Sequence, residues 1–324
     1  MVCKNYGAQA APQPDAGFPE KVRSTARKVG SSPLFLAATL CYTLILLLGL
    51  AGALSLSCAS NNIFDLYTNN LREEMGITLS FDLSMVFLIT CLMGMLPMLF
   101  IAIGLWITFG SCAGHKPKVN TAGLAMIFVT TLIQLVLTTL LFLGSLAMLA
   151  VMYCNASSIF GKDAEIMKTA LLVDGVILLL VFSFVLFCFI KLCTTVANIR
   201  NTLQTGIPNK KVSRLVGVLC CIGSALAFFF AVESILTISI TTMDAFNHSA
   251  YGLLRTILYL SVPAFLLITG MLILFGALIF SYRSKMAELE TESRLNAFKT
   301  LSYAAPYTSP VYIPPQPETK EENL

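Results

Sequence analysis

Six long apolar runs constrain the fold of this chain more than any other feature of its sequence. They cover residues 33–57, 83–109, 122–153, 169–199, 215–243 and 256–282. A helix needs about 20 apolar residues to cross a bilayer, and each run meets that length. Backbone polar groups must be hydrogen-bonded inside the lipid, so each run is expected to be helical. The sequence therefore predicts an all-α polytopic membrane bundle of six transmembrane helices.

The composition agrees with a chain that mostly faces lipid. Of its 324 residues, 56% are hydrophobic and only 12% are charged, whereas soluble domains carry about 25% charged residues. The lipid bilayer is therefore the first expected partner. The formal net charge of +4 is small, and no nucleic-acid partner is expected from it.

Lysine and arginine are distributed unevenly between the segments that connect the runs. The two termini and the loops 110–121 and 200–214 together contain 16 basic residues. The alternate segments, 58–82, 154–168 and 244–255, contain 4. Basic residues concentrate on the cytoplasmic side of a membrane. Both termini are therefore predicted to be cytoplasmic (N-in/C-in).

These patterns divide the chain into three parts. Residues 1–32 are expected to form a cytoplasmic polar tail, and 33–282 the six-helix transmembrane domain. Residues 283–324 are expected to continue the last helix into the cytoplasm and to end in a Pro-rich disordered tail. In the first outer segment, apolar residues between Phe64 and Met75 recur at helical spacing. They predict either an amphipathic helix or a solvated loop with a chance stripe.

The fifth run contains an acidic residue, Glu233, which makes it the leading candidate for a functional site. Thr237 follows one helical turn later, on the same face. A second stripe of small residues lies nearly opposite Glu233, and such stripes let membrane helices approach closely. Its members are Cys220, Ser224, Ala227, Ala231 and Ser234. We expect this helix to pack on more than one side.

Polar residues on other runs are candidate partners for Glu233. Gln134 and Thr138 share one face of the third run, where they could line a polar path or form interhelical hydrogen bonds. Asp174 lies near the outer end of the fourth run, and Arg255 near the outer start of the sixth. Arg255 is a candidate partner for either acid, and Gln134 is a candidate partner for Glu233.

The ten cysteines show no metal-binding spacing, and no metal site or cofactor is expected. Cys58 and Cys154 each follow an outward-going run and lie on the same predicted outer side. A disulfide between them is chemically allowed in an oxidising compartment. The alternative is two free thiols.

No catalytic motif was found in the sequence. It lacks the GxSxG, HExxH, P-loop and GxGxxG patterns. The chain is therefore expected not to be an enzyme.

The sequence Ser32-Pro33-Leu34-Phe35-Leu36 opens the first run, and Gly104-Leu105-Trp106 closes the second before a short basic loop. In these features, roughly the first 125 residues resemble uncharacterised multi-pass membrane proteins of Gram-positive gut bacteria. The resemblance implies a bacterial plasma membrane and carries no known activity or site residue.

Two functions remain open at this point. The first is a non-enzymatic membrane protein that acts by assembly or partner binding, with a membrane-protein partner or as a homo-oligomer. The second is a small transporter or channel subunit in which Glu233 and the Gln134 face line a polar path.

Overall fold

The computed structural model describes residues 17–75, 83–114, 119–161, 164–208, 212–241 and 250–304. Within these ranges the chain forms helices and no strand. The helices are α1 (Phe18–Gly30), α2 (Pro33–Met75), α3 (Leu83–Ala113), α4 (Ala122–Cys154), α5 (Ala156–Phe160), α6 (Ala164–Thr205), α7 (Arg214–Thr241) and α8 (Ala250–Ala304). Six of them, all except α1 and α5, are long and apolar enough to cross a membrane. The predicted all-α, six-span architecture is confirmed, and it is that of an integral multi-pass membrane protein.

Two helices continue well past the predicted spans. α2 is unbroken from Pro33 to Met75, so the Phe64–Met75 stripe belongs to the first spanning helix and is not a separate surface helix. α8 runs for 55 residues and carries the last span into the polar C-terminal region. The Pro-rich segment from residue 305 onward lies outside the described residues.

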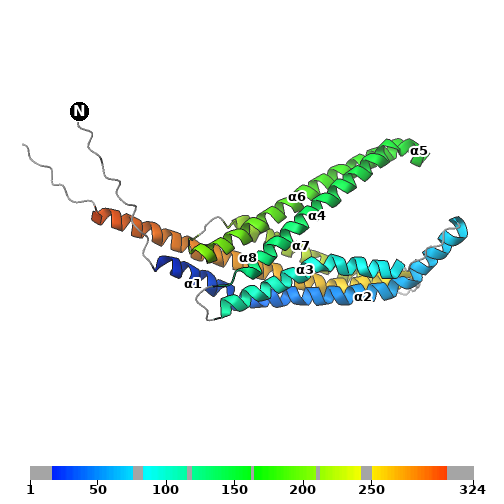
Figure 1. Ribbon diagram of the computed structural model, residues 1–324. Coiled ribbons are helices and arrows are strands. Elements are labelled where there is room, and N and C mark those ends of the chain that lie inside the picture. The colour runs from blue at the N-terminus through cyan, green and yellow to red at the C-terminus, as the bar shows by residue number, and fades with distance from the viewer. Residues whose placement is uncertain are drawn as a thin grey trace, which may run out of the picture.

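The spanning helices form two groups that meet at one end (Figure 1). In the first group, α7 packs against α8, α8 against α2, and α2 against α3. The second group is the hairpin of α4 and α6, joined to the first group through the contact of α4 with α3. From that junction the hairpin diverges from the other helices toward its tip at α5 (Figure 1). We call the hairpin the α4/α6 arm.

The arm is buried at its base and, beside α5, at its tip, where Ala156, Ala164 and Leu171 are buried. The buried residues of α4 are Gly123, Leu124, Ile127, Thr130 and Thr131, all within its first ten positions. Beyond them, large apolar side chains of α4 and α6 such as Leu141 and Ile166 are exposed. In a membrane such side chains face lipid tails, which are as apolar as the side chains themselves.

The hydrophobic core lies at the end where the two groups meet, around α1. Val22, Ala26 and Val29 of α1 pack there with residues of α2, α3, α4, α6 and α8, including Met286 and Leu289. The location has a physical reason. At the membrane edge, burying an apolar side chain removes it from water, so the hydrophobic effect favours a core there. Within lipid the side chain is already away from water, and the hydrophobic effect does not drive burial.

α1 forms within the segment expected to be a polar tail. Pro19 lies in its first turn, where a missing N–H costs nothing. Glu20 lies in the same turn, and Arg27 and Lys28 lie in the last turn, so the charges complement the helix dipole. Its buried residues recur at spacings of four and three, which places them on one face.

Two arginines of α1 hold the ends of α3 and α6. Arg27 Nε donates to the carbonyl of Cys112 at 2.8 Å, and Arg23 Nη2 donates to the carbonyl of Gln204 at 2.7 Å. Both carbonyls lie in the last turn of their helix, where no N–H within the helix can bond them. Lys21 adds an exposed ion pair with Glu292 of α8 at 2.5 Å. α1 therefore links α3, α6 and the part of α8 that follows its apolar run, residues 283–304, which we call the α8 extension.

The end of α6 is shaped to receive the start of α1. Gly206 has φ +71°, a conformation that side chains rarely adopt, and its N–H bonds the carbonyl of Thr202 at 2.9 Å. A Cβ at this position would lie 2.6 Å from the carbonyl oxygen of Pro19. Both the backbone conformation and the space therefore require glycine.

Candidate functional site

The small-residue stripe of α7 packs against α8; its spacing predicted a closely approaching helix but not which one. Ser224, Ala227, Ala231 and Ser234 are buried, and α7 and α8 form the most extensive helix pair in the described structure. The Ser261 hydroxyl of α8 donates to the Ser234 hydroxyl at 3.0 Å. Small side chains allow this close approach, and paired hydroxyls bridge it.

Glu233 lies on the face of α7 turned away from that seam, and its side chain is exposed. Its helical neighbours Phe229 and Leu236 are 63% and 59% exposed. Apart from α8, α7 contacts α6 only slightly. The expected second packing face of α7 is therefore not filled by the part of the chain that the structure describes, because the α4/α6 arm diverges from the helices that hold α7.

The carboxylate of Glu233 makes no hydrogen bond or ion pair with any described residue. The Thr237 hydroxyl, one turn on, donates to the main-chain carbonyl of Glu233 at 2.9 Å and not to its carboxylate. At 1.5 Å per residue, Glu233 lies roughly 27 Å along the axis from Leu215, near the far edge of a hydrocarbon layer about 30 Å thick. It is thus an exposed acid in the half of α7 remote from α1.

The polar residues of α4 do not reach Glu233. Gln134 and Thr138 are half-buried, and no hydrogen bond to another described residue involves either side chain. Three other hydroxyls on this helix donate to backbone carbonyls one turn earlier: Thr131 to Ile127 at 2.7 Å, Thr139 to Leu135 at 2.8 Å and Ser145 to Leu141 at 2.9 Å. α4 packs on α3 and α6, so the structure does not bring Gln134 and Glu233 together.

Asp174 lies exposed on α6, in the outer part of the arm. It lines a shallow depression of about 510 Å³ with Ile166, Thr169, Ala170 and Val173. Arg255 was the expected partner of either Asp174 or Glu233. Its side chain lies outside the described residues. Both pairings stay predictions.

The two cysteines considered for a disulfide are described unequally. Cys154 ends α4 as an exposed free thiol. The side chain of Cys58 lies outside the described residues, so a bridge between them stays a prediction. Across the described ranges, no three His, Cys, Asp or Glu residues are grouped in a way that could hold a metal ion.

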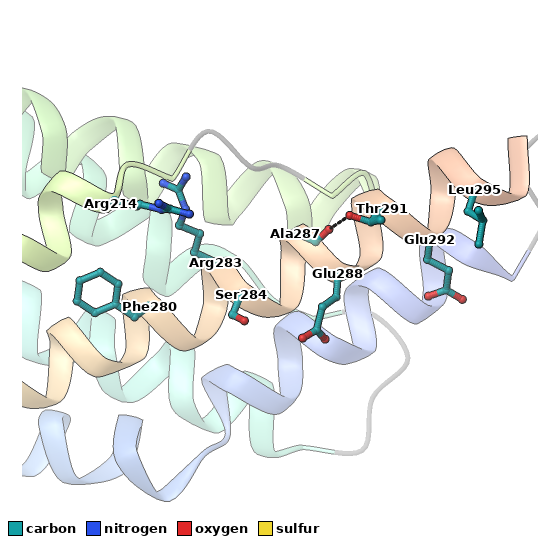
Figure 2. Close-up of a pocket in the computed structure, with 9 residues that line it drawn as sticks. All are labelled: Arg214, Phe280, Arg283, Ser284, Ala287, Glu288, Thr291, Glu292 and Leu295. Carbon is teal, nitrogen blue, oxygen red and sulfur yellow. Dashed lines mark hydrogen bonds between the residues drawn. The ribbon is translucent and has the colours of Figure 1, made fainter. Parts of the chain in front are cut away.

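The sequence interpretation missed a second polar region, at the junction of α7 and α8. Arg214 begins α7, directly before its apolar run, and Arg283 lies on α8 directly after its apolar run. Both line one groove of about 850 Å³ (Figure 2). Counting charges by loop shows the excess of basic residues, but it cannot show that two of them share a groove.

Comparison with known proteins adds no family or function to this geometry. No protein-family model, no curated protein and no solved structure matches the chain.

Proposed function

We propose that this integral membrane protein acts by assembly: the Glu233 face of α7 binds a second membrane polypeptide, and the chain performs no catalysis of its own. One observation carries the proposal. Glu233 is an exposed carboxylate within a spanning helix, surrounded by exposed Phe229 and Leu236 and without a described polar partner.

The cost of leaving this acid in lipid favours such a partner. Insertion scales assign about 2.5–3.5 kcal/mol to a charged side chain at the bilayer centre, and Glu233, which lies near the edge of the hydrocarbon layer, incurs only a part of that cost. A neighbouring helix that presents a cation, amide or hydroxyl at the same depth removes much of that cost. The large apolar residues around Glu233 would then pack against the same helix. Another copy of this chain or a different membrane protein would satisfy these requirements.

Substitution of Glu233 tests the assembly. In nanodiscs drawn directly from the native membrane, the wild-type particle should contain more than one polypeptide. Glu233→Leu should weaken the association by roughly 5- to 30-fold, the value of one interhelical polar contact of about 1–2 kcal/mol. Glu233→Gln should keep more of it, because an amide still forms hydrogen bonds. Particle mass measured over a dilution series gives the result.

Val232→Leu is the matched control, since it changes a neighbouring exposed apolar residue of the same helix. It should leave the particle mass unchanged. A wild-type particle that holds a single chain, or a Glu233→Leu variant that assembles like wild type, would contradict the proposal.

Transport is the second candidate function, and the polar line of α4 favours it, because Gln134 and Thr138 are half-buried and form no hydrogen bond to another described residue. A transport path would bring water to these two side chains. In that case a cysteine at position 134 should react with a water-soluble thiol reagent at the rate of a loop cysteine. A protein that is monomeric and also reactive at this position would support transport over assembly.

The proposal includes cytoplasmic termini, which the 16-to-4 distribution of basic residues supports, and a bacterial plasma membrane, which only the sequence resemblance implies. The fold agrees in one respect: α1 and the α8 extension lie at the same end of the molecule, joined by the Lys21–Glu292 ion pair. A reporter that is active only in the cytoplasm, fused after Gly114 or Gly206, should be active. The same reporter fused after Gly161 should be inactive, and the reverse pattern would overturn the orientation.

A further inference from the structure

We propose that the groove at the α7/α8 junction binds the phosphate of an anionic phospholipid, held by Arg214 and Arg283. The residues that line the groove include Arg214, Phe280, Arg283 and Ser284, together with Glu288 and Glu292. This inference depends on the placement of the helices in a membrane and not on the proposed assembly.

The two arginines lie at the level expected for lipid headgroups. Arg214 directly precedes the apolar part of α7, and Arg283 directly follows Tyr282 at the end of the apolar part of α8. Figure 2 shows both side chains at the same end of the groove, with the ring of Phe280 below them. Phe280 and the neighbouring Leu215 are exposed. A lipid phosphate at the arginines would therefore place its acyl chains along an apolar surface.

The positive charge at this end of the groove is not neutralised by the described residues. Arg283 uses Nη1 to donate to the main-chain carbonyl of Val212 at 2.9 Å, which fixes its position and leaves its other nitrogens available. Arg214 makes no hydrogen bond or ion pair within the described chain. Two guanidinium groups at one site repel each other, and a phosphate between them relieves that repulsion while it accepts bidentate hydrogen bonds.

The other polar groups of the groove define where a phosphate can bind. Ser284 is exposed beside Arg283 and offers a hydroxyl donor. Glu288 and Glu292 lie further along α8, away from the apolar runs (Figure 2), and Glu292 is paired with Lys21. These carboxylates repel an anion from the outer part of the groove, so the arginine end is the favoured position.

Lipid titration followed by native mass spectrometry tests the inference on the full-length protein in detergent. Phosphatidylglycerol should bind the wild-type protein more tightly than phosphatidylcholine of the same chain length. Each basic residue near an anionic lipid contributes about 1 kcal/mol. Arg214→Gln and Arg283→Gln should therefore each weaken phosphatidylglycerol binding roughly 5-fold, and the double variant should bind more weakly than either.

Lys285→Gln is the matched control, because it removes the same charge from an exposed position of α8 that does not line the groove. It should bind phosphatidylglycerol like wild type. If Arg283→Gln fails to fold without its bond to Val212, Arg214→Gln carries the test alone.

Three results would overturn the inference. The first is equal affinity of the wild-type protein for the two lipids. The second is an equal loss in Lys285→Gln, which would indicate a general effect of charge. The third is displacement of phosphatidylglycerol by millimolar inorganic phosphate, which would assign the groove to a soluble phosphate instead.

Discussion

Gly123→Ala is expected to destabilise the protein strongly and to release the base of the α4/α6 arm. A Cβ at position 123 would lie 2.5 Å from the Thr108 hydroxyl oxygen and 2.8 Å from the Thr108 main-chain nitrogen, and it would also meet the carbonyl oxygen of Gly104. Two of these atoms belong to the backbone of α3, so they cannot move aside as a flexible side chain would. Overpacking of this kind costs about 1–3 kcal/mol and occasionally more.

Gly144→Ala on the same helix is the control for this substitution. A Cβ at position 144 meets nothing within 4 Å, so alanine should be neutral or should stabilise the helix by about 0.5–1 kcal/mol. Thermal unfolding of all variants in the same detergent measures the effect. The Tm of Gly123→Ala should be lower than that of the wild-type protein, and the Tm of Gly144→Ala should be equal to it or higher. Equal Tm values for the two variants would mean that α3 and α4 do not cross at Gly123.

Val22→Asp is the second substitution with a large expected effect. Val22 is 0% exposed and lies in the core shared by α1, α6 and α8. Leaving an unpaired charge buried costs about 3–5 kcal/mol. That cost exceeds what the exposed contacts of α1 can offset, because surface ion pairs such as Lys21–Glu292 contribute about 1 kcal/mol or less. We expect α1 to detach while the spanning helices remain folded.

Limited trypsin digestion measures the detachment. The target bonds follow Arg23 and Arg27, which the docked helix protects through their bonds to Gln204 and Cys112. Cleavage at these sites should accelerate by about 100-fold or more in Val22→Asp, as a 3–5 kcal/mol change in docking predicts. Ser24→Asp introduces the same charge at an exposed position of α1 and should be cleaved like wild type. Equal protection of both variants would contradict the docked α1.

The six spans and the α7/α8 seam could be predicted from the sequence because both depend on local patterns. A long apolar run must be helical in lipid whatever its neighbours are. Small residues at spacings of four and three place a seam on one face of a helix, and Ala231 and Ser234 are buried on that face. Neither inference requires knowledge of which helix lies alongside.

The pairing of distant polar groups could not be predicted in the same way. Gln134 lies on a polar face of α4 and Glu233 on the exposed face of α7. The arm that carries Gln134 diverges from α7, and no local sequence pattern specifies the angle between them. Helix α1 was not predicted, because the polar composition of residues 1–32 indicated a tail. The apolar stripe within it is short and consists of Val22, Ala26 and Val29. That stripe, preceded by Pro19, was the signal that could have revealed the helix.

Photo-crosslinking from position 229 tests the central claim, assembly through the Glu233 face, most directly. A benzophenone amino acid in place of Phe229 lies one turn from Glu233 on the same exposed face. Irradiation of intact membranes should join this position to a polypeptide, and the product should decrease when Glu233→Leu is added. The same probe at Leu141, exposed on the arm, should react with lipid. A probe at 229 that yields only lipid adducts, like the probe at 141, would contradict the assembly.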